Sequence, residues 1–332
     1  MNILKAAVLH HPHDLRIDDR PVPTNPGPRD VVVAIRAVGL CGSEVHYYEE
    51  GRIGEHVLNA PMVIGHELGG VIAEVGSEVD PGRVGEVVAL EPGIPCGQCL
   101  YCKRGDYNFC PDIRFFATPP IDGALQERVI HPDRWTFPAY DLTPAQAALA
   151  EPLSVGVYAA RTVNIAADDT VLVIGAGAVG LLTALACISR NATVTVAEIN
   201  ESRISAGQKM ELNVTTPALV KNDTFSVVME CSGSAEGIQL AHKCVSPHGH
   251  IALIGLGSET AMQLDGLRLS QAGITVHGIF RYAHTFPEAI DILRKYRARL
   301  KPLLEFTIPM QALPELMQSH EYLAHVKTMV VL

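Results

Sequence analysis

A short apolar strand followed by a glycine-spaced turn limits the fold of this 332-residue chain more than any other feature. The run Thr170 to Ile174 is rich in β-branched residues, and the turn Gly175-x-Gly177-x-x-Gly180 follows it directly. A strand that leads into such a turn, with a helix after it, is typical of a dinucleotide-binding βαβ unit. The alternative is a tight turn that binds no nucleotide.

The chain after about residue 154 alternates between strand and helix patterns. We expect strands at 170–174, 193–197, 225–230 and 250–254, and helices at 178–189, 201–212 and about 235–245. This alternation predicts an α/β fold with a doubly wound parallel sheet. The uncharged run 170–189 also has the length of a membrane-spanning helix. Its three glycines, and the change from β-branched residues to helix formers, favour the βα unit.

The residues before about 150 follow a different pattern. Short β-rich runs, such as Asp30 to Val38 and Val84 to Leu90, are broken repeatedly by Gly and Pro. This pattern predicts a barrel-like β domain whose loops carry the chemistry. The β-like C-terminal segments indicate that the tail rejoins this domain. We therefore expect a β domain over 1–153, completed by 281–332, and a parallel-sheet domain over 154–280.

Composition excludes several kinds of partner. The formal charge is −10 and only 19% of the residues are charged, so the clustered Lys and Arg that nucleic acid requires are lacking. The N-terminus runs into a strand-like stretch without the features of a signal peptide, which favours the cytoplasm and no membrane partner. We expect Cys187, Cys231 and Cys244 to lie in the core, because they occur in apolar stretches.

Four further cysteines form the run Cys96-x-x-Cys99-x-x-Cys102-x7-Cys110. Thiols at this spacing can close a tetrahedral shell of four sulfurs within one loop. Protein ligands then fill every position, so we expect a structural zinc that holds a loop with little core of its own. The alternative is four unliganded cysteines.

A second possible ligand set is dispersed. Cys41 follows one apolar strand, and the pair His66-Glu67 follows another. A thiolate, an imidazole and a carboxylate without a fourth protein ligand leave one zinc position open for water or an alcohol. From the residues alone, this interpretation stays open against a buried Cys and a hydrogen-bonded His.

Two glutamates occupy positions that suggest chemistry. Glu151 lies where the two sequence patterns meet, and domain junctions favour active sites. We expect Glu151 to bind the zinc water or to replace it transiently, with an ordinary salt bridge as the alternative. Glu198 ends the second strand at the distance expected for a carboxylate that binds a ribose diol and repels a 2′-phosphate, which favours NAD over NADP. By contrast, we expect His10-His11-Pro12-His13 to be an exposed turn.

Taken together, the chain resembles the zinc-containing medium-chain dehydrogenases, and within them the sorbitol and xylitol dehydrogenases. The resemblance covers nearly the whole chain. It rests on Gly39-Leu40-Cys41-Gly42-Ser43-Glu44-Val45-His46-Tyr47, Gly65-His66-Glu67, Leu90-Glu91-Pro92-Gly93, Ala117-Thr118-Pro119-Pro120-x-Asp122-Gly123, Glu151-Pro152-Leu153-Ser154-Val155-Gly156, Glu230-Cys231-Ser232-Gly233 and Phe280-Arg281-Tyr282. The Ala-Thr-Pro-Pro and Phe-Arg-Tyr segments are the ones more particular to the polyol branch.

The resemblance implies a GroES-like β-barrel catalytic domain, a Rossmann NAD-binding domain and an active site between them. It makes Cys41, His66 and Glu67 the ligands of a catalytic zinc. Ser43 matches the hydroxyl that contacts the reacting alcohol. His46 matches the relay histidine that passes the alcohol proton toward solvent, with a surface histidine as the alternative.

The same resemblance supplies the remaining site residues. The residues that would border a polyol are Tyr47, Phe115 or Phe116, Arg281 and Tyr282. Arg281 would donate to a hydroxyl away from the zinc. The expected cofactor site combines the glycine turn and Glu198 with Val179 and Arg203.

The chain departs from the family pattern in three places. The stretch between Leu212 and Phe225 is short, so one strand or helix of the Rossmann sheet is expected to be reduced to loop. The four-cysteine set, which the animal sorbitol dehydrogenases lack, places the chain with the two-zinc type. Glu44 replaces the more usual Asp beside the metal ligands.

The reaction implied is the NAD-dependent oxidation of a secondary hydroxyl of a polyol to a ketose, in a homotetramer or homodimer. One alternative is a zinc dehydrogenase of a simple secondary alcohol or of an amino alcohol such as threonine. Another is a non-catalytic nucleotide-binding protein of the same fold. The intact set of ligand residues argues against the last.

Overall fold

The computed structural model describes residues 3–255, 257 and 263–332. The chain forms two compact units, Met1–Glu151 with Leu304–Leu332, and Pro152–Leu303. The first boundary falls close to the predicted residue 153. The return to the first unit comes at Leu304, later than the predicted residue 281.

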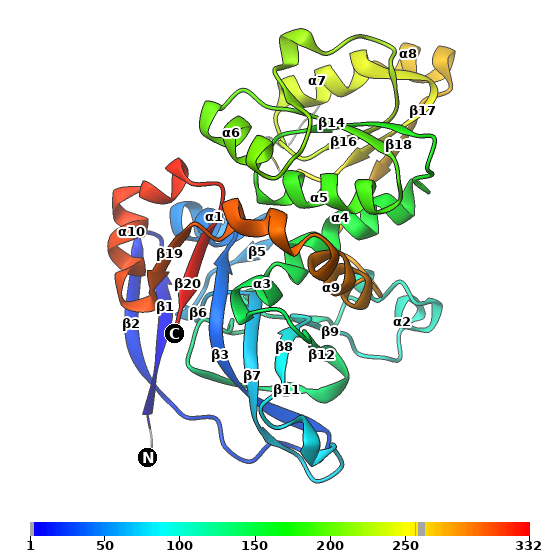
Figure 1. Ribbon diagram of the computed structural model, residues 1–332. Helices are drawn as coiled ribbons and strands as arrows, with labels where there is room; N and C mark the ends of the chain where they lie inside the picture. The colour runs from blue at the N-terminus through cyan, green and yellow to red at the C-terminus, as the bar shows by residue number, and fades with distance from the viewer. Residues whose placement is uncertain (1–2, 256, 258–262) are drawn as a thin grey trace. The chain divides into compact units, whose positions relative to one another are not determined.

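The first unit is built around a sheet in the order β12-β8-β7-β3-β20-β19, with β11 also paired to β3. Its strands are β3 (Asp30–Leu40), β7 (Glu67–Val75), β8 (Val87–Leu90), β11 (Arg128–Pro132), β12 (Thr136–Pro138), β19 (Phe306–Pro309) and β20 (Thr328–Val331). Figure 1 shows β3 between β7 and the C-terminal strand β20, drawn in red. Residues from the end of the chain therefore complete the first unit, as the sequence pattern predicted.

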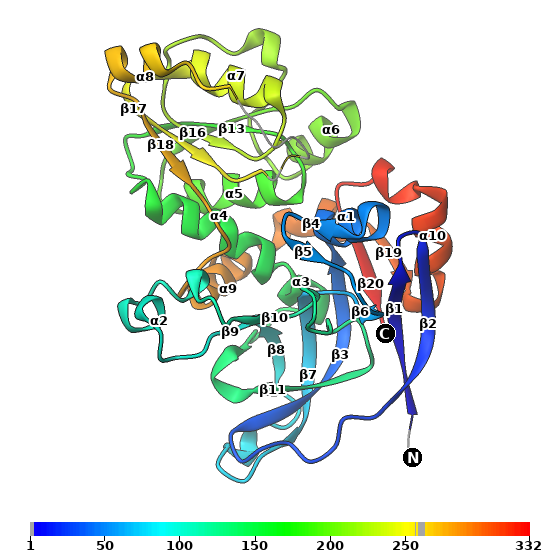
Figure 2. The same ribbon diagram turned by 180° about the vertical axis from the view of Figure 1, so that it is seen from behind.

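Smaller elements surround this sheet. They are β1 (Ile3–His11), β2 (Asp14–Pro21), β6 (Met62–Val63), the hairpin β4 (Arg52–Ile53) and β5 (His56–Val57), the pair β9 (Gly93–Ile94) and β10 (Arg114–Phe115), and the helices α1 (Gly42–Glu50), α2 (Leu100–Arg104), α3 (Pro144–Ala148) and α10 (Leu313–Ser319). Figure 2 shows β6, β1 and β2 side by side, in the sheet order β2-β1-β6. Apolar residues of β1, β3 and β7 fill one hydrophobic core with residues of α10. The predicted β-rich domain is confirmed.

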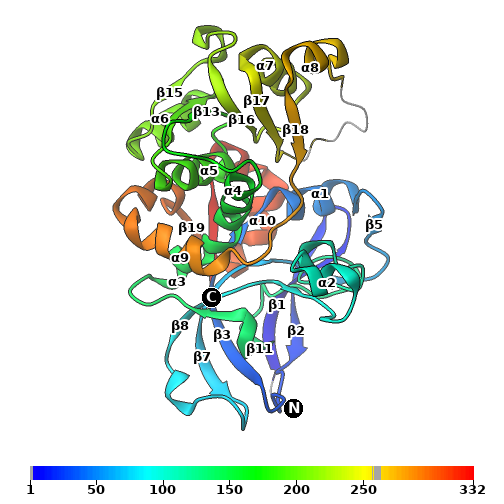
Figure 3. The same cartoon turned by 90° about the vertical axis from the view of Figure 1, so that its right-hand side faces the viewer.

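The second unit contains a parallel sheet in the order β15-β14-β13-β16-β17-β18. Its elements are α4 (Ala150–Thr162), β13 (Thr170–Ile174), α5 (Ala178–Ser189), β14 (Thr193–Ala197), α6 (Glu201–Lys209), β15 (Val214–Thr215), β16 (Phe225–Glu230), α7 (Ala235–Cys244), β17 (Val245–Leu253), α8 (Gly266–Ala272), β18 (Thr275–Gly278) and α9 (Phe286–Lys295). Figure 3 shows α5 on one face of the sheet and α7 with α8 on the other. This order confirms the predicted doubly wound fold.

Helix α9 explains why the second unit extends to Leu303. Its buried residues Phe286 and Leu293 form an apolar face, and its first turn carries Glu288. The carboxylate of Glu288 forms ion pairs with Arg161 of α4 and with Arg190, which follows α5. Both partners belong to the second unit, which accounts for the assignment of α9 to it.

Two alternatives from the sequence are settled by the local structure. The run 170–189 is divided between β13 and α5, so the membrane-spanning interpretation is wrong. Over the described ranges, the structure contains no helix with the length and apolar character needed to cross a membrane. The short stretch 212–225 holds only the two-residue strand β15 and one 3₁₀ turn at Pro217–Leu219, as the shortened sequence predicted.

The histidines of the 10–13 run lie around the turn between β1 and β2. His10 pairs with Asp18 and His11 with Asp14, whereas His13 pairs with Glu49 of α1. The carboxylate partners differ, so these side chains do not converge on one ion. His10 and His11 end strand β1, and Pro12 and His13 form the turn, so the prediction of an exposed turn is confirmed only for the second half of the run.

Candidate functional site

The four-cysteine loop brings its sulfurs to one point. The Sγ atoms of Cys96, Cys99, Cys102 and Cys110 all lie within 4.8 Å of one another. Cys102 Sγ is 3.4 Å from Cys99 Sγ and 3.9 Å from Cys96 Sγ. A zinc ion bonded to four sulfurs at about 2.3 Å separates the sulfurs by about 3.8 Å. The four side chains therefore fit a closed, structural zinc site.

Backbone groups of the same loop favour thiolates. The N–H groups of Cys99, Cys102 and Cys96 donate to the sulfurs of Cys96, Cys99 and Cys110, each at 3.4 Å. The N–H groups of Gln98 and Cys99 lower the pKa of Cys96 to about 7. Burial, by contrast, raises the pKa of Cys102 to about 12 and also raises the pKa of Cys110. Metal-bound cysteines are deprotonated, so zinc binding in this loop would release protons from these thiols.

A second cluster is formed by Cys41, Glu44 and His66, whose ligand atoms all lie within 4.8 Å of one another. Cys41 precedes helix α1, and Glu44 lies in the first turn of that helix. His66 Nδ1 is 2.5 Å from Glu44 Oε1, and the Cys41 N–H donates to Glu44 Oε2 at 2.9 Å. The buried carboxylate therefore holds Nδ1 of the ring, which leaves Nε2 for a metal.

The charge state of His66 follows from the same contact. Burial opposes protonation of the ring, but the adjacent charge of Glu44 raises the pKa of His66 well above its usual value. A metal ion requires a neutral imidazole nitrogen, so metal binding at His66 releases a proton. Phe115 covers this ring, with a centroid distance of 5.9 Å.

His66 also belongs to a third cluster, with Glu67 and Glu151, whose atoms lie within 4.8 Å and are all buried. Possible ligand atoms of His66 thus lie within 4.8 Å of the Cys41 thiol in one cluster and of both carboxylates in the other. Cys41 and Glu67 fall in different clusters of this kind. The placement of Glu151 beside His66 supports the expectation that it acts close to a metal ion.

Glu91 is a further carboxyl group of this region. Burial raises the pKa of Glu91 to about 8, although the Tyr107 hydroxyl, which donates to Glu91 Oε1 at 2.6 Å, acts in the opposite direction. The negative charge of Glu151 adds to the rise. Glu91 is therefore largely protonated at neutral pH and adds little negative charge next to the cluster.

The sequence reasoning missed Lys327, which is 5% exposed and reaches into this cluster. Its Nζ forms an ion pair with Glu67 Oε2 and donates to the Leu40 carbonyl at 3.0 Å. Burial opposes the charge of Lys327, but the negative groups around it, above all Glu67, raise its pKa above the usual value. The available signal was a single lysine immediately before the apolar strand β20.

Helix α1 carries the predicted proton-transfer residues. Ser43 and His46 are both half-buried and lie one turn apart, so they share a face of the helix. His46 Nδ1 is 3.6 Å from Glu50 Oε1. Tyr47 is 3% exposed and packs in the hydrophobic core, and its contact with a substrate stays a prediction.

Arg281 and Tyr282 lie in the second unit. The Arg281 guanidinium carbon is 4.9 Å from the centroid of the Phe280 ring. Tyr282 is buried, and its ring is 5.8 Å from that of Phe286. Contact between these two residues and a substrate stays a prediction.

The glycine turn has the geometry of a phosphate-binding turn. Gly175 has φ = +96°, a value that favours glycine, and its N–H donates to the Ala197 carbonyl at 2.8 Å. A Cβ on Gly177 would meet no atom within 4 Å, so space for a ligand lies directly before the N-terminus of α5. Val179 lies in the first turn of that helix. The N-terminal end of α5, where the first N–H groups of a helix have no partner within the helix, fits the pyrophosphate of a dinucleotide.

Glu198 follows β14 and is almost completely buried. Its Oε2 accepts a hydrogen bond from the Ala176 N–H at 2.6 Å, and its Oε1 accepts from the N–H groups of Ile199 and Asn200 at 2.8 and 2.9 Å. The carboxylate therefore ties the glycine turn to the end of the neighbouring strand. Arg203 lies nearby in the first turn of α6, which Asn200 caps.

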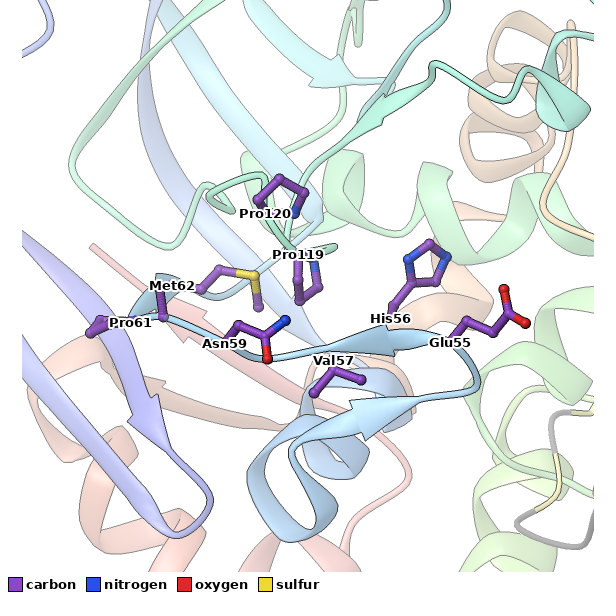
Figure 4. A pocket seen from close by; sticks show the side chains of 9 residues that line it. Glu55, His56, Val57, Asn59, Pro61, Met62, Pro119 and Pro120 are labelled. Atoms are coloured by element: carbon purple, nitrogen blue, oxygen red, sulfur yellow. The ribbon is translucent and has the colours of Figure 1, made fainter.

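A cavity of about 370 Å³ lies elsewhere in the first unit. Its lining residues are Glu55, His56, Val57, Asn59, Ala60, Pro61, Met62, Pro119 and Pro120. Figure 4 shows that two segments line it: one runs through β5 and carries Glu55 and His56, and the other carries Pro119 and Pro120. The candidate zinc ligands are not among the lining residues, so this cavity does not mark the metal cluster.

Comparison with known proteins agrees with the two units. Residues 27–141 match the alcohol dehydrogenase GroES-like domain, and residues 178–295 match the zinc-binding dehydrogenase family. The chain is 38% identical to sorbitol dehydrogenase of Bacillus subtilis over 303 residues, which cover 87% of this chain and 86% of that protein. It is 36% identical to sorbitol dehydrogenase of Homo sapiens over 320 residues, 92% of this chain and 89% of that protein.

Solved structures agree as well. The L-idonate 5-dehydrogenase of Escherichia coli superposes with a TM-score of 0.91 at 25% identity, and the match covers 100% of this chain and 99% of that one. The resemblance inferred from the motifs is thus confirmed by sequence and by fold. The chain belongs to the zinc-binding, medium-chain dehydrogenase family, whose GroES-like and Rossmann domains are its two units.

Proposed function

We propose that this chain is an NAD-dependent zinc dehydrogenase that oxidises a secondary hydroxyl of a polyol to a ketose. The observation that carries this proposal is the pair of clusters that share His66, one with Cys41 and Glu44 and one with the buried carboxylates of Glu67 and Glu151. Relatives named sorbitol dehydrogenase and putative D-xylulose reductase support a polyol as the substrate.

Cys41, His66 and Glu67 would hold the catalytic zinc, which when bound acts as a Lewis acid toward the substrate hydroxyl. Glu44 keeps the His66 ring in the tautomer that offers Nε2 to a metal. Glu151, buried beside His66, is placed to bind a water molecule or a second hydroxyl of a vicinal diol. These roles give a physical reason for a carboxylate-rich site to accept polyols.

The proton of the alcohol needs a path to solvent. The Ser43 hydroxyl accepts it from the substrate, and His46, one turn along α1, passes it on as a general base. Bound NAD⁺ supplies the hydride acceptor. The glycine turn and α5 hold its pyrophosphate, and Glu198 disfavours a 2′-phosphate at the adenosine ribose, so NAD is preferred to NADP.

The test is the rate of NADH formation with a panel of polyols that have four to six carbons, together with metal analysis. We expect activity with at least one polyol and about two zinc ions per chain. Cys41→Ala should abolish turnover and remove one zinc while NAD binding persists. Activity with 2-butanol or threonine and with none of the polyols would instead assign the chain to the alternative substrate class.

The expected assembly follows from the resemblance alone, whereas the expected location and partners follow from sequence features and composition. We propose a homotetramer or homodimer that works in the cytoplasm on a small molecule, without nucleic acid or membrane partners. Light scattering coupled to size-exclusion chromatography measures the assembly directly. A monomer would contradict the first of these expectations.

A further inference from the structure

Three adjacent strands place Lys327 beside a predicted metal ligand. The register pairs Gly39 of β3 with Glu67 of β7 on one side and with Met329 of β20 on the other. Paired residues share a face of the sheet, and residues two apart on one strand share it too. Lys327, two residues before Met329, therefore lies on the same face as Glu67, with Gly39 between them.

Gly39 leaves the space in which this pair meets. A Cβ built on Gly39 would lie 2.0 Å from Glu67 Oε2 and 2.8 Å from Lys327 Cε. Any larger residue at this position on the central strand would push the carboxylate and the ammonium apart. The ion pair between Lys327 and Glu67 thus depends on a residue that has no side chain.

The contacts of Lys327 leave one oxygen of Glu67 free. Lys327 pairs with Oε2, whereas Oε1 is buried and has no hydrogen-bond partner among the described residues. Lys327 also donates to the carbonyl of Leu40, the residue before Cys41. The ammonium group of Lys327 therefore binds the Glu67 carboxylate and also the backbone next to the Cys41 thiol.

We propose that Lys327 is a positioning residue of the catalytic metal centre, which holds Glu67 Oε2 so that Oε1 is presented to the metal as a single oxygen ligand. This inference rests on the proposed function, because it requires a metal at Cys41, His66 and Glu67. The ammonium also offsets one of the two anionic ligands. The ammonium would thus reduce the negative charge around a bound zinc ion, which would favour its role as a Lewis acid.

The experiment measures zinc affinity at the two sites separately, by competition with a chelator followed by metal counting. Lys327→Met should keep the structural zinc and bind the second zinc about 10- to 100-fold more weakly, the range found when partners of metal ligands are removed. Gly39→Ala should weaken the same site while Lys327 is retained. Lys327→Arg, which keeps the charge, should recover part of the affinity.

The visible spectrum of the cobalt-substituted protein adds a readout that a general loss of stability would not change. We expect the bands of the catalytic site to differ between wild type and Lys327→Met, because the oxygen ligand moves. Retention of the cysteine-loop metal and of NAD binding shows that both units are folded. If the Met variant fails to fold, Gly39→Ala and Lys327→Arg decide the question.

Two kinds of failure are distinguishable. If wild type binds two metals, Cys41→Ala binds one, and Lys327→Met and Gly39→Ala both bind the second as tightly as wild type, the positioning role is overturned and the proposed function survives. If wild type binds one metal only, or Cys41→Ala still binds two, the catalytic zinc assignment fails and the role of Lys327 fails with it.

Discussion

His131 has a fully buried imidazole ring, and burial favours the neutral form of this ring in the folded protein. Its Nε2 donates to the Glu91 carbonyl at 3.0 Å, and its ring packs 5.2 Å from that of Phe116. Burial lowers the pKa of His131 to about 4. The unfolded chain, with a histidine pKa of about 6.5, binds a proton that the folded chain does not accept.

This difference predicts how stability changes with pH. Above about pH 6.5 both states are neutral at His131, and as the pH falls from there toward 4 the unfolded state gains protons and the free energy of unfolding decreases. His131→Gln keeps a donor for the Glu91 carbonyl but does not titrate. We therefore expect the loss of unfolding free energy between pH 6.5 and 4 to be smaller in this variant by roughly 2–3 kcal/mol. Urea unfolding between pH 4 and 8 measures it. An unchanged slope, with His10→Gln as the surface control, would contradict the prediction.

Glu198 gives a second prediction for a single residue. Glu198→Ala leaves the Ala176 N–H without its acceptor, so the glycine turn loses the contact that ties it to β14. We expect NAD⁺ to bind roughly tenfold more weakly, as for the loss of a charged hydrogen bond, and the preference over NADP⁺ to shrink. Calorimetric titration of both cofactors tests this. Glu201→Ala, an exposed neighbour in α6, should bind NAD⁺ like wild type, and equal affinity in both variants would refute the role of Glu198.

The loop from Cys96 to Cys110 is an element that depends on its metal. Its helix α2 has only five residues, and Leu100, Tyr101 and Phe109 remain exposed, so little apolar burial holds it. Cys102→Ala should remove one zinc and make this loop sensitive to protease, while the catalytic site keeps its own metal. Limited proteolysis with metal analysis measures both effects. A loop that resists protease without zinc would show that other contacts hold it.

The elements that the sequence predicted well are local. The unit β13, glycine turn and α5 is recognisable because its strand, turn and helix signals are contiguous, and the four cysteines converge because fourteen residues or fewer separate them. The boundary at Leu303 was not predicted, because it depends on the ion pairs of Glu288 with two distant arginines. Lys327 was missed for the same reason, since its partner precedes it by most of the chain.

The first unit is built from two separate segments of the chain, because the chain leaves it after Glu151 and returns to it at Leu304. Residues 304–332 supply β20 and the edge strand β19 to the main sheet. They also supply buried core residues such as Met310, Leu313, Met317 and Val330. Each such side chain contributes about 1.5–3 kcal/mol, and the net stability of a domain is about 5–15 kcal/mol.

Removal of residues 304–332 should therefore prevent the first unit from folding. We expect the truncated chain to aggregate or to lose near-ultraviolet circular dichroism, while the full chain unfolds cooperatively. Leu323→Ala, which changes an exposed residue of the same segment, should have little effect. A soluble truncated protein with a protease-resistant first unit would contradict this expectation.

The ion pair of Lys327 with Glu67 has a consequence for the order of events during synthesis. The thiol and imidazole segments leave the ribosome early, but the lysine that pairs with the carboxylate follows them by most of the described chain. A nascent chain can thus acquire the zinc of its cysteine loop long before it can finish the other centre. The carboxylate of that centre gains its ionic partner only once Lys327 has been made.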